Sequence, residues 1–511
     1  MHMIHCRAMS NTSTILLACI CLNFAAQAQV RQTGYLKASN AEAGDHFGNG
    51  GTLEGKGVAL SGDGTTMAVG APYESSKAKG VGGDQKDNSL YASGAVYIFT
   101  RNGANWTQQA YLKASNPGQS DKFGYAVSLS QDGNTLAVSA YWEASAAKGV
   151  NGNQNDRSIP QAGAVYVFTR TGTRWTQQAY VKASNTGEAG KGEDLTDGDQ
   201  FGFSIGLSAD GNTLAVGAIS EDSGAKGING DQADNSKQSS GAVYIFTRAA
   251  GSWTQQAYIK ASNTDPNDLF GYAVGLSADG NTLAASAYDE DSSSRTINGP
   301  MDTGRRGSGA VYVFTRTGAT WAQTAYLKAS NAEAGDSMGY DVAISQDGNT
   351  IAAGAADEDC LKPGVNPEGC DNDRASDTSA GAAYVFVRAN GTWTQQAFLK
   401  ASNPGMEDWF GARLTLSGDG ATLAVGAQLE DGSSKVINGP HDDAAEDAGA
   451  VYLFTRTDTT WRQVAYVKAA NAQAYSEFGS ALALSRDGAL MAIGARSEAA
   501  EAGAVYVFGT R

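Results

Sequence analysis

The stretch W-T-Q-Q-A-Y-L-K-A-S-N, residues 106–116, decides the fold because the chain repeats it. Each copy follows shortly after a segment like G-A-V-Y-V-F-T-R. Counted from the aromatic residue of Y-L-K-A-S-N, the copies begin at Tyr35, Tyr111, Tyr180, Tyr258, Tyr326, Phe398 and Tyr466. About seven repeats of roughly 70 residues therefore fill nearly everything after the first thirty residues. This arrangement leaves no room for a separate catalytic domain.

Four strand signals recur in each repeat. In the second copy they are the segments 123–130, 135–140, 163–170 and 175–184. The first alternates large residues such as Phe123 and Tyr125 with glycine, alanine and serine, which is the period of a β-strand. The D-G pair at 132–133 and the T-G pair at 171–172 are typical of tight hairpin turns. The pattern predicts an all-β fold, a seven-bladed β-propeller with four antiparallel strands per blade.

The two ends of the chain are complementary. The first copy enters at V-R-Q-T-G-Y-L-K-A-S-N, where Val30 stands in for the tryptophan of the other copies. The chain stops after G-A-V-Y-V-F-G-T-R, just before the next W-T-Q-Q would be due. An open solenoid would need polar caps at its ends. We therefore expect the N-terminal strand to complete the last blade, so that residues 29–511 form one closed domain.

The repeated blocks F-G-Y-A-V, D-G-N-T-L-A-V-G-A and G-A-V-Y-V-F resemble the FG-GAP repeats of the integrin α-chain N-terminal propeller. The whole pattern, over about residues 31–511, is similar to bacterial secreted proteins built only of such repeats. This resemblance implies a binding or adhesion module. The integrin-type calcium run D-x-D/N-x-D-G-x-x-D is missing here. What remains of it is an aspartate before a glycine, and we interpret these residues as turn formers: Asp132, Asp210, Asp279, Asp347, Asp419 and Asp487.

Composition limits the class of partner. The chain has 511 residues, 41% of them hydrophobic, and a formal net charge of -16. Nucleic acids and anionic membranes are bound through basic patches, so this charge disfavours both. Cationic partners or metal ions fit better.

The N-terminus reads as a signal peptide, residues 1–28. Arg7 precedes an apolar run at 14–26, and Ala26-Gln27-Ala28 is a small-x-small cleavage site. A lipoprotein anchored at Cys19 is the alternative. No later stretch is apolar for 18 residues, so we expect a soluble monomer that is secreted, periplasmic or exposed at the cell surface. Outside the signal only Cys360 and Cys370 remain, and in an oxidising compartment they predict a disulfide.

The variable sequence lies in long connections between the second and third strands, which strand order places on one face. In the third and first repeats these loops offer carboxylate and amide oxygens, the ligands that Ca²⁺ prefers. The candidate calcium ligands are Glu221, Asp222, Asn229, Asp231, Asp234, Asn235, Glu74, Asp84, Asp87 and Asn88. The alternative is a solvated acidic loop held by Asx-turns.

A second acidic series precedes the F-G motif in each repeat. Its recurrence favours a turn or a bond to a backbone amide over a ligand site. The members are Asp45, Asp121, Asp199, Asp268, Asp336 and Asp408, with Glu477 shifted by one in the last repeat.

Catalytic motifs such as G-x-S-x-G, H-E-x-x-H and CxxC are missing from the sequence, so we expect no enzyme. A glycosidase using paired acids such as Asp289 and Glu290 is a remote alternative. The sequence predicts a non-catalytic, exported binding or adhesion module that contacts a protein or glycan at a cell surface through its loop-rich face, with Ca²⁺ as a candidate cofactor. The other alternative is a carbohydrate lectin. Its candidate aromatic ligand-binding residues are Tyr73, Tyr141, Trp142, Tyr288 and Trp409.

Overall fold

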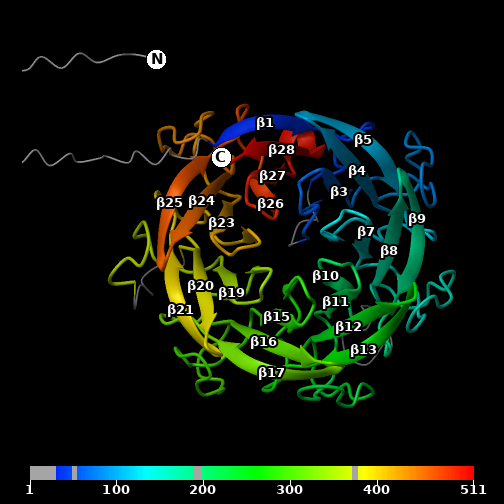
Figure 1. Ribbon diagram of the computed structural model, residues 1–511, viewed down its shortest axis with the longest axis horizontal. Helices are drawn as coiled ribbons and strands as arrows, with labels where there is room; N and C mark the ends of the chain where they lie inside the picture. The colour runs from blue at the N-terminus through cyan, green and yellow to red at the C-terminus, as the bar shows by residue number, and fades with distance from the viewer. Residues whose placement is uncertain (1–29, 49–54, 188–197, 371–377, 511) are drawn as a thin grey trace, which may run out of the picture.

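The computed structural model describes residues 30–48, 55–187, 198–370 and 378–510. The predicted signal peptide lies outside this range. Seven four-stranded antiparallel sheets stand around a central axis like the blades of a propeller (Figure 1). Strands run from the innermost to the outermost position of each blade, so the short hairpins share one face, here called the turn face. The long connections share the other, the loop face. The predicted fold is confirmed.

The strands are as follows. Blade 1 contains β2 (Val58–Leu60), β3 (Thr66–Ala71), β4 (Ala95–Asn102) and β5 (Asn105–Leu112); blade 2 contains β6 (Val127–Leu129), β7 (Thr135–Ala140), β8 (Ala164–Thr171) and β9 (Arg174–Val181). Blade 3 contains β10 (Phe201–Leu207), β11 (Thr213–Ala218), β12 (Ala242–Ala249) and β13 (Ser252–Ile259); blade 4 contains β14 (Val274–Leu276), β15 (Thr282–Ala287), β16 (Ala310–Thr317) and β17 (Thr320–Leu327). Blade 5 contains β18 (Val342–Ile344), β19 (Thr350–Ala355), β20 (Ala382–Ala389) and β21 (Thr392–Leu399); blade 6 contains β22 (Arg413–Leu416), β23 (Thr422–Ala427), β24 (Ala450–Thr457) and β25 (Thr460–Val467).

Blade 7 closes the ring with strands from both ends of the chain. It contains β26 (Phe478–Leu484), β27 (Leu490–Ala495), the short helix α1 (Glu498–Glu501), β28 (Ala504–Gly509) and, outermost, β1 (Arg31–Leu36). β1 pairs antiparallel with β28, and Tyr35 lies opposite Tyr506. In Figure 1 the blue N-terminal strand lies directly outside the red C-terminal one. The predicted closure is confirmed, and it places β28 between β27 and β1, so that the C-terminal strand is not an open edge.

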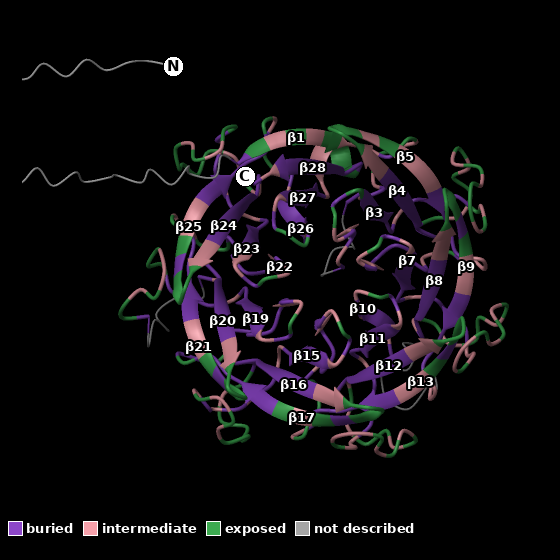
Figure 2. Ribbon diagram, in the orientation of Figure 1, coloured by how far each residue is buried: buried purple, intermediate pink, exposed green. Residues whose placement is uncertain are grey.

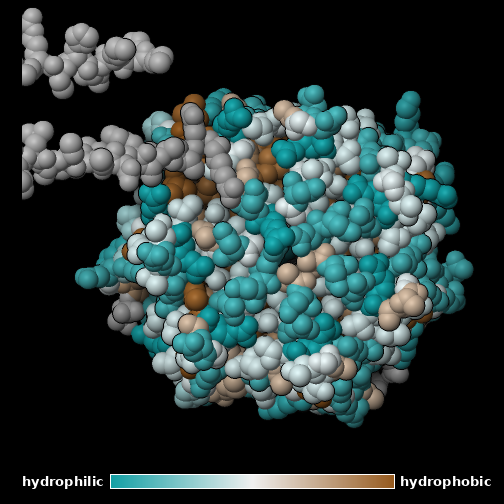
Figure 3. All heavy atoms as spheres, in the orientation of Figure 1, coloured by the Kyte–Doolittle hydropathy of each residue, from teal (hydrophilic) through white to brown (hydrophobic). Residues whose placement is uncertain are grey.

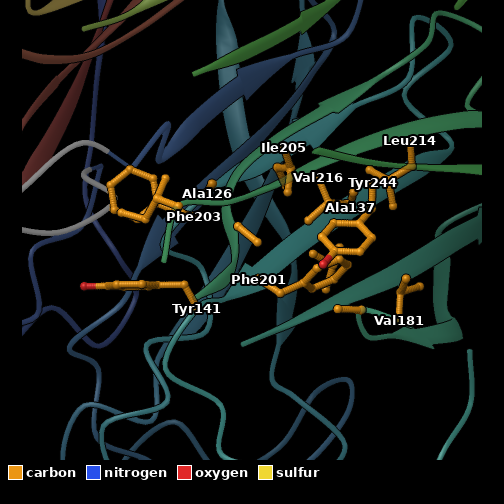
Figure 4. Close-up of a cluster of buried hydrophobic side chains, with 14 of the residues drawn as sticks. Ala126, Ala137, Tyr141, Val181, Phe201, Phe203, Ile205, Leu214, Val216 and Tyr244 are labelled. Atoms are coloured by element: carbon orange, nitrogen blue, oxygen red, sulfur yellow. The ribbon is translucent and has the colours of Figure 1, made fainter. Parts of the chain in front are cut away.

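Neighbouring blades pack large residues on small ones. The second strand of each blade is almost entirely buried, whereas the outermost strand alternates between buried and exposed residues (Figure 2). The small residues of the second strand are required because the F-G turn of the next blade lies on them: a Cβ on Gly70 of β3 would come within 1.9 Å of the carbonyl oxygen of Gly124. The phenylalanine of that turn, Phe123, packs edge-on against Tyr166, with ring centroids 5.3 Å apart. Figure 4 shows one such inter-blade cluster, formed mainly by blades 2 and 3.

A closed ring of backbone hydrogen bonds surrounds the axis on the turn face. In each blade the residue before the Asp-Gly turn donates its N–H to the carbonyl of the same residue in the next blade, at 2.8–3.0 Å. The ring runs through Gly62, Gln131, Ala209, Ala278, Gln346, Gly418 and Arg486 and returns to Gly62. Because only the backbone takes part, the side chain at this position is free to differ between blades.

A side-chain clasp joins most blade pairs nearer the outer rim. Trp253 Nε1 and Arg248 Nη1 of blade 3 both donate to Gln178 Oε1 of blade 2, each at 3.0 Å. The equivalent glutamines Gln109, Gln256 and Gln396 accept from Trp175, Trp321 and Trp461 in the same way. At the seam between blades 4 and 5, Thr324 stands where blades 1, 2, 3 and 5 have glutamine. There the Nε1 of Trp393 is buried with no hydrogen-bond partner among the described residues.

Two further predictions are confirmed. The aspartate of each Asp-Gly turn shapes the turn, since Asp132 Oδ1 accepts hydrogen bonds from Ser130 Oγ (2.6 Å) and the Asn134 amide (2.9 Å). Cys360 and Cys370 form a disulfide, with their Cα atoms 5.4 Å apart.

Within the described ranges, the structure has no helix of the length and apolar character needed to cross a membrane.

Candidate binding site at the loop-face mouth

The repeats differ most where the axis opens on the loop face, here called the loop-face mouth. Three places in the described parts of the repeats supply its residues: the residue before the F-G pair (M-G in blade 5), the residue after that pair, and the two residues that follow the second strand. The strands around these places are nearly identical in every blade. Since loops on a rigid scaffold are the usual carriers of binding residues, this face is the candidate site. Figure 3 shows one face of the molecule, hollowed near its centre and mostly hydrophilic around it.

The residue before the F-G pair, which is M-G in blade 5, has left-handed backbone geometry in every blade. Its φ lies between 52° and 59°, and the members are His46, Lys122, Gln200, Leu269, Ser337, Trp409 and Glu477. Residues with a Cβ rarely adopt this region, and each such residue costs on the order of 1 kcal/mol. The surrounding turn fixes the backbone: the Lys122 amide, for example, donates to the Ala92 carbonyl at 3.0 Å. The fold therefore presents seven different side chains from one rigid backbone shape.

Aromatic rings form a continuous arc along the mouth from blade 2 to blade 6, here called the aromatic arc. Tyr141 lies on Tyr125 with ring centroids 4.0 Å apart, and Tyr288 lies on Tyr272 at 4.1 Å. The arc consists of Trp142, Tyr141, Tyr125, Phe203, Tyr272, Tyr288, Tyr340 and Trp409. Figure 4 shows Phe203 and Tyr141 at the end of their cluster, away from Phe201 and Tyr244.

Four of the five candidate ligand-binding aromatics, Tyr141, Trp142, Tyr288 and Trp409, are thus brought into one arc. In sequence they look irregular because each blade contributes a different mouth position. Tyr125, Phe203, Tyr272 and Tyr340 were missed by the sequence analysis. Their signal was present, since each directly follows the glycine of the F-G motif or, for Tyr340, of the M-G pair that replaces it.

The rest of the mouth, around blades 7, 1 and 2, carries charged side chains. The fifth candidate, Tyr73, stacks on His46 with ring centroids 4.8 Å apart. The Nζ of Lys122 lies 5.0 Å from the ring centre of Tyr73 and 3.4 Å from that of Trp142. Burial lowers the pKa of Lys122 to about 8. Burial also lowers the pKa of His46, although Glu501 opposes the shift.

A cavity of about 470 Å³ opens beside Tyr73, at the seam between blades 7 and 1. Tyr91, His46 and the carboxylates of Asp45 and Glu501 line it together with Asn88. Burial raises the pKa of Asp45 to about 6. In blade 2 the corresponding aspartate, Asp121, pairs with Arg157. Blade 1 has the shorter Asn88 at the place of Arg157, so Asp45 has no such partner.

The candidate calcium ligands Glu74 and Glu221 occupy a different role from the predicted one. Glu221 Oε2 lies 2.7 Å from Lys260 Nζ, and Glu221 Oε1 accepts a hydrogen bond from Tyr258 Oη at 2.7 Å. Both residues of the pair are buried. An ammonium at this distance occupies the place where a cation would bind, so these glutamates do not fit a calcium shell. The same buried pair recurs as Glu74–Lys113, Glu143–Lys182, Glu290–Lys328, Glu358–Lys400 and Glu430–Lys468, and the last blade has a partly exposed counterpart, Glu498–Lys37.

The other candidate calcium ligands shape their own loops or lie apart. Backbone amides donate to Asp222, Asp231 and Asp234 of blade 3 and to Asp84 and Asp87 of blade 1, at 2.8–3.0 Å. Asn229 accepts from the Tyr258 amide, Asn88 donates to Glu42, and Asn235 lines a cavity of about 300 Å³. In the part of the chain that the structure describes, no three His, Cys, Asp or Glu side chains are grouped so as to hold a metal ion. Calcium binding by the protein stays a prediction.

The acidic series before the F-G motif binds backbone amides, as the sequence indicated. Asp121 accepts from Gly118 at 2.7 Å, Asp268 from Asp265 at 2.8 Å and Asp408 from Gly405 at 2.6 Å. Burial is the largest influence on these carboxyls. It raises the pKa of Asp268 to about 8 and that of Asp408 to about 7.

Comparison with known proteins agrees with this architecture. A sequence profile described as FG-GAP repeat matches residues 106–168, 253–314, 321–386, 393–454 and 461–508, together more than half of the chain. The β-propeller domain of Cps50 (Swd1) from Myceliophteria thermophila is similar with a TM-score of 0.51 and 9% identity, over 94% of this chain and 100% of that one. Hydrazine synthase from Kuenenia stuttgartiensis gives a TM-score of 0.45 and 13% identity, over 87% and 93%. At its identity the first likeness shows the fold alone. No curated protein sequence is significantly similar.

Proposed function

The chain belongs to the FG-GAP repeat family, and from this premise we propose that it is an exported, non-catalytic binding or adhesion module whose contact surface is the loop-face mouth. The observation that carries the proposal is the pattern of difference between the blades. The strands are alike because they pack alike, whereas the seven residues of left-handed geometry, from His46 to Glu477, are all of different types. A purely structural turn would favour glycine or asparagine at these positions.

The chemistry of the mouth suits protein or glycan recognition. Aromatic rings provide large, rigid contact area at a low cost in conformational entropy, and they are enriched among residues that dominate binding energy. Trp142, Tyr288 and Trp409 are only partly buried, so each keeps some surface for a partner. The charges of the surrounding acidic loops would act mainly on the association rate and on specificity. Ca²⁺ would assist through those loops, without Glu74 and Glu221 as ligands.

A carbohydrate lectin is the second candidate function. It is favoured by one specific observation: the cavity at the seam between blades 7 and 1 combines tyrosine side chains, Tyr73 and Tyr91, with amide and carboxylate groups. A sugar ring can stack on an aromatic face while its hydroxyls donate to carboxylates. The cavity volume of about 470 Å³ is within the range of small-molecule sites.

Binding of the fluorescently labelled mature protein to a glycan array and to immobilised cell-surface proteins tests both candidates. Retention on glycans that is lost in Tyr91→Ala favours the lectin. Retention on proteins that is unaffected by Tyr91→Ala favours the adhesion module. Tyr91 is largely exposed, so this substitution should leave the fold intact. No retention on either surface, with and without Ca²⁺, would contradict the proposed function.

A further inference from the structure

Lys122 is a buried cation without a carboxylate partner among the described residues. Only 5% of its surface is exposed. Its Nζ faces the rings of Trp142 at 3.4 Å, Tyr73 at 5.0 Å and Tyr141 at 5.4 Å, and it donates a hydrogen bond to Tyr141 Oη at 3.3 Å. Ring faces stabilise an ammonium by electrostatic attraction, but they leave most of its N–H groups without an acceptor. Buried lysines are otherwise paired with an anion.

The buried lysines that recur in the repeats of this chain show what Lys122 lacks. Lys113, in the neighbouring blade, has Glu74 Oε2 at 2.7 Å and the hydroxyl of Ser93 at 2.8 Å. Glu74 is therefore already neutralised by its own lysine. Near the mouth, Glu477 pairs with Arg496 in the same way. Among the described residues, no hydrogen bond or salt bridge joins Lys122 to a carboxylate.

Trp142 adds a second unmatched donor to the same cluster. Its indole Nε1 is buried and has no hydrogen-bond partner among the described residues. An indole nitrogen can only donate, and a buried donor without an acceptor costs about 1–3 kcal/mol. Buried polar groups in native proteins are nearly always satisfied by protein, water or a ligand. Two donors in contact therefore call for an acceptor with more than one oxygen.

The neighbouring groups of the cluster do not supply this acceptor. His46 stacks on Tyr73 and pairs with Glu501, at 3.6 Å between Nε2 and Oε2. The position of Lys122 is also specific to blade 2: Gln200 and Ser337 stand at the same left-handed position in blades 3 and 5. The fold therefore does not need a lysine here, and the lysine requires another explanation.

We propose that Lys122 and Trp142 form an oxyanion subsite of the loop-face mouth, which binds a carboxylate or sulfate group of the ligand. The oxygens of this group accept hydrogen bonds from Lys122 Nζ and Trp142 Nε1, while the body of the ligand lies against the aromatic arc beginning at Tyr141. The inference rests on the proposed function, because it assigns a ligand chemistry to the same site. It also adds selectivity, since the surrounding acidic surface repels anions that do not reach the two donors.

Titration of the protein, labelled with ¹⁵N-tryptophan, with sodium acetate and separately with sodium sulfate tests the subsite at constant ionic strength set by chloride. We expect the indole signal of Trp142, assigned from Trp142→Phe, to move saturably in the parent. In Lys122→Gln the dissociation constant should rise about tenfold or more, as expected for loss of a charge-assisted hydrogen bond. Glutamine matches Gln200, so the backbone geometry should persist. Lys79→Gln, at an exposed position, is the control and should behave like the parent.

A response to acetate alone assigns a carboxylate, and a response to sulfate alone assigns a sulfate ester. No saturable movement with either anion, or equal movement in the parent and Lys122→Gln, would overturn the proposal. Should Lys122→Gln fail to fold, Lys122→Arg replaces it and must retain binding. If the parent still binds its glycan or protein surface while neither anion moves the signal, the subsite is wrong and the proposed function stands.

Discussion

Lys56 of blade 1 and Asp341 of blade 5 form an ion pair across the central axis, with Nζ and Oδ1 2.8 Å apart. Asp341 also accepts hydrogen bonds from the amides of Val342 at 2.7 Å and Leu414 at 2.8 Å. One buried carboxylate therefore holds blades 1, 5 and 6 together below the loop-face mouth. The pair ties opposite sides of the ring, which neighbouring-blade packing cannot do.

Replacing the two partners should have unequal effects. Asp341→Ala leaves two backbone amides without an acceptor and should lower the free energy of unfolding by about 3 kcal/mol. Asp341 keeps its two amide donors in Lys56→Met, and Lys56 has a third of its side chain exposed to water, so this variant should cost about 1 kcal/mol after solvent screening. Chemical denaturation of both variants measures the difference. A larger loss in Lys56→Met than in Asp341→Ala would contradict this account.

Replacing one partner of the buried pair Glu221–Lys260 should lower the free energy of unfolding strongly, whereas replacing both partners should lower it much less. Lys260→Met leaves a buried carboxylate unpaired and should destabilise by about 3–5 kcal/mol. Adding Glu221→Gln removes that charge and should restore most of the loss. Asp231→Asn, at an exposed position of the same loop, is the matched control and should stay within about 0.5 kcal/mol of the parent. A double variant no more stable than Lys260→Met alone would show that charge is not the cause.

The fold could be predicted almost completely from the sequence because seven copies of one unit repeat the same strand and turn signals. The role of Glu221 could not be predicted within one loop, where it looks like one of several surface acids. The signal was the joint recurrence of two residues in separate segments. A glutamate follows the second strand of every blade, and the Y-L-K-A-S segment supplies a lysine in every blade. A glutamate and a lysine that recur together in every repeat of a buried core indicate an ion pair.

The binding site was predicted only in part, because its residues come from different blades. Sequence order places the loops on one face, but it does not show that Trp142 and Trp409, from different positions of different blades, border the same axis. Only the ring geometry brings them into one arc. The unmatched donor at Trp142 is likewise invisible in the sequence, because it depends on which acceptors reach it.

Restoring a missing clasp should stabilise the ring. Thr324→Gln offers an acceptor to the buried Nε1 of Trp393, which has none among the described residues, and should add about 1 kcal/mol to the free energy of unfolding. The reciprocal change, Gln396→Thr, removes the acceptor of Trp461 Nε1 and should cost about 1–2 kcal/mol. Melting temperatures of the two variants should move in opposite directions. A stabilising Gln396→Thr would refute the clasp.

Stability should fall as the pH rises from about 4 to about 8. Burial raises the pKa of Asp268 to about 8 and those of Asp336 and Asp408 to about 7, from the ordinary value of 3.8. The folded protein therefore holds these protons more tightly than the unfolded chain, and deprotonation favours unfolding. The melting temperature should be higher at pH 5 than at pH 8. Asp268→Asn keeps an acceptor for the Asp265 amide and should reduce the pH dependence of the melting temperature. An unchanged pH dependence in this variant would contradict the role given to Asp268.

Binding by two matched double variants tests the role of the loop-face mouth most directly. The first double variant, Trp142→Ser with Trp409→Ser, replaces both mouth tryptophans with serine. Serine already stands at the equivalent positions of other blades, as Ser220 and Ser337. The second, Gln131→Ala with Gln346→Ala, introduces on the turn face the alanine that Ala209 and Ala278 provide at the same position of other blades. On the surface that retains the parent protein, the mouth variant should lose at least about tenfold in affinity, as expected for aromatic residues that dominate an interface. The turn-face variant should bind like the parent. Normal binding by the mouth variant and loss of binding by the turn-face variant would contradict the account.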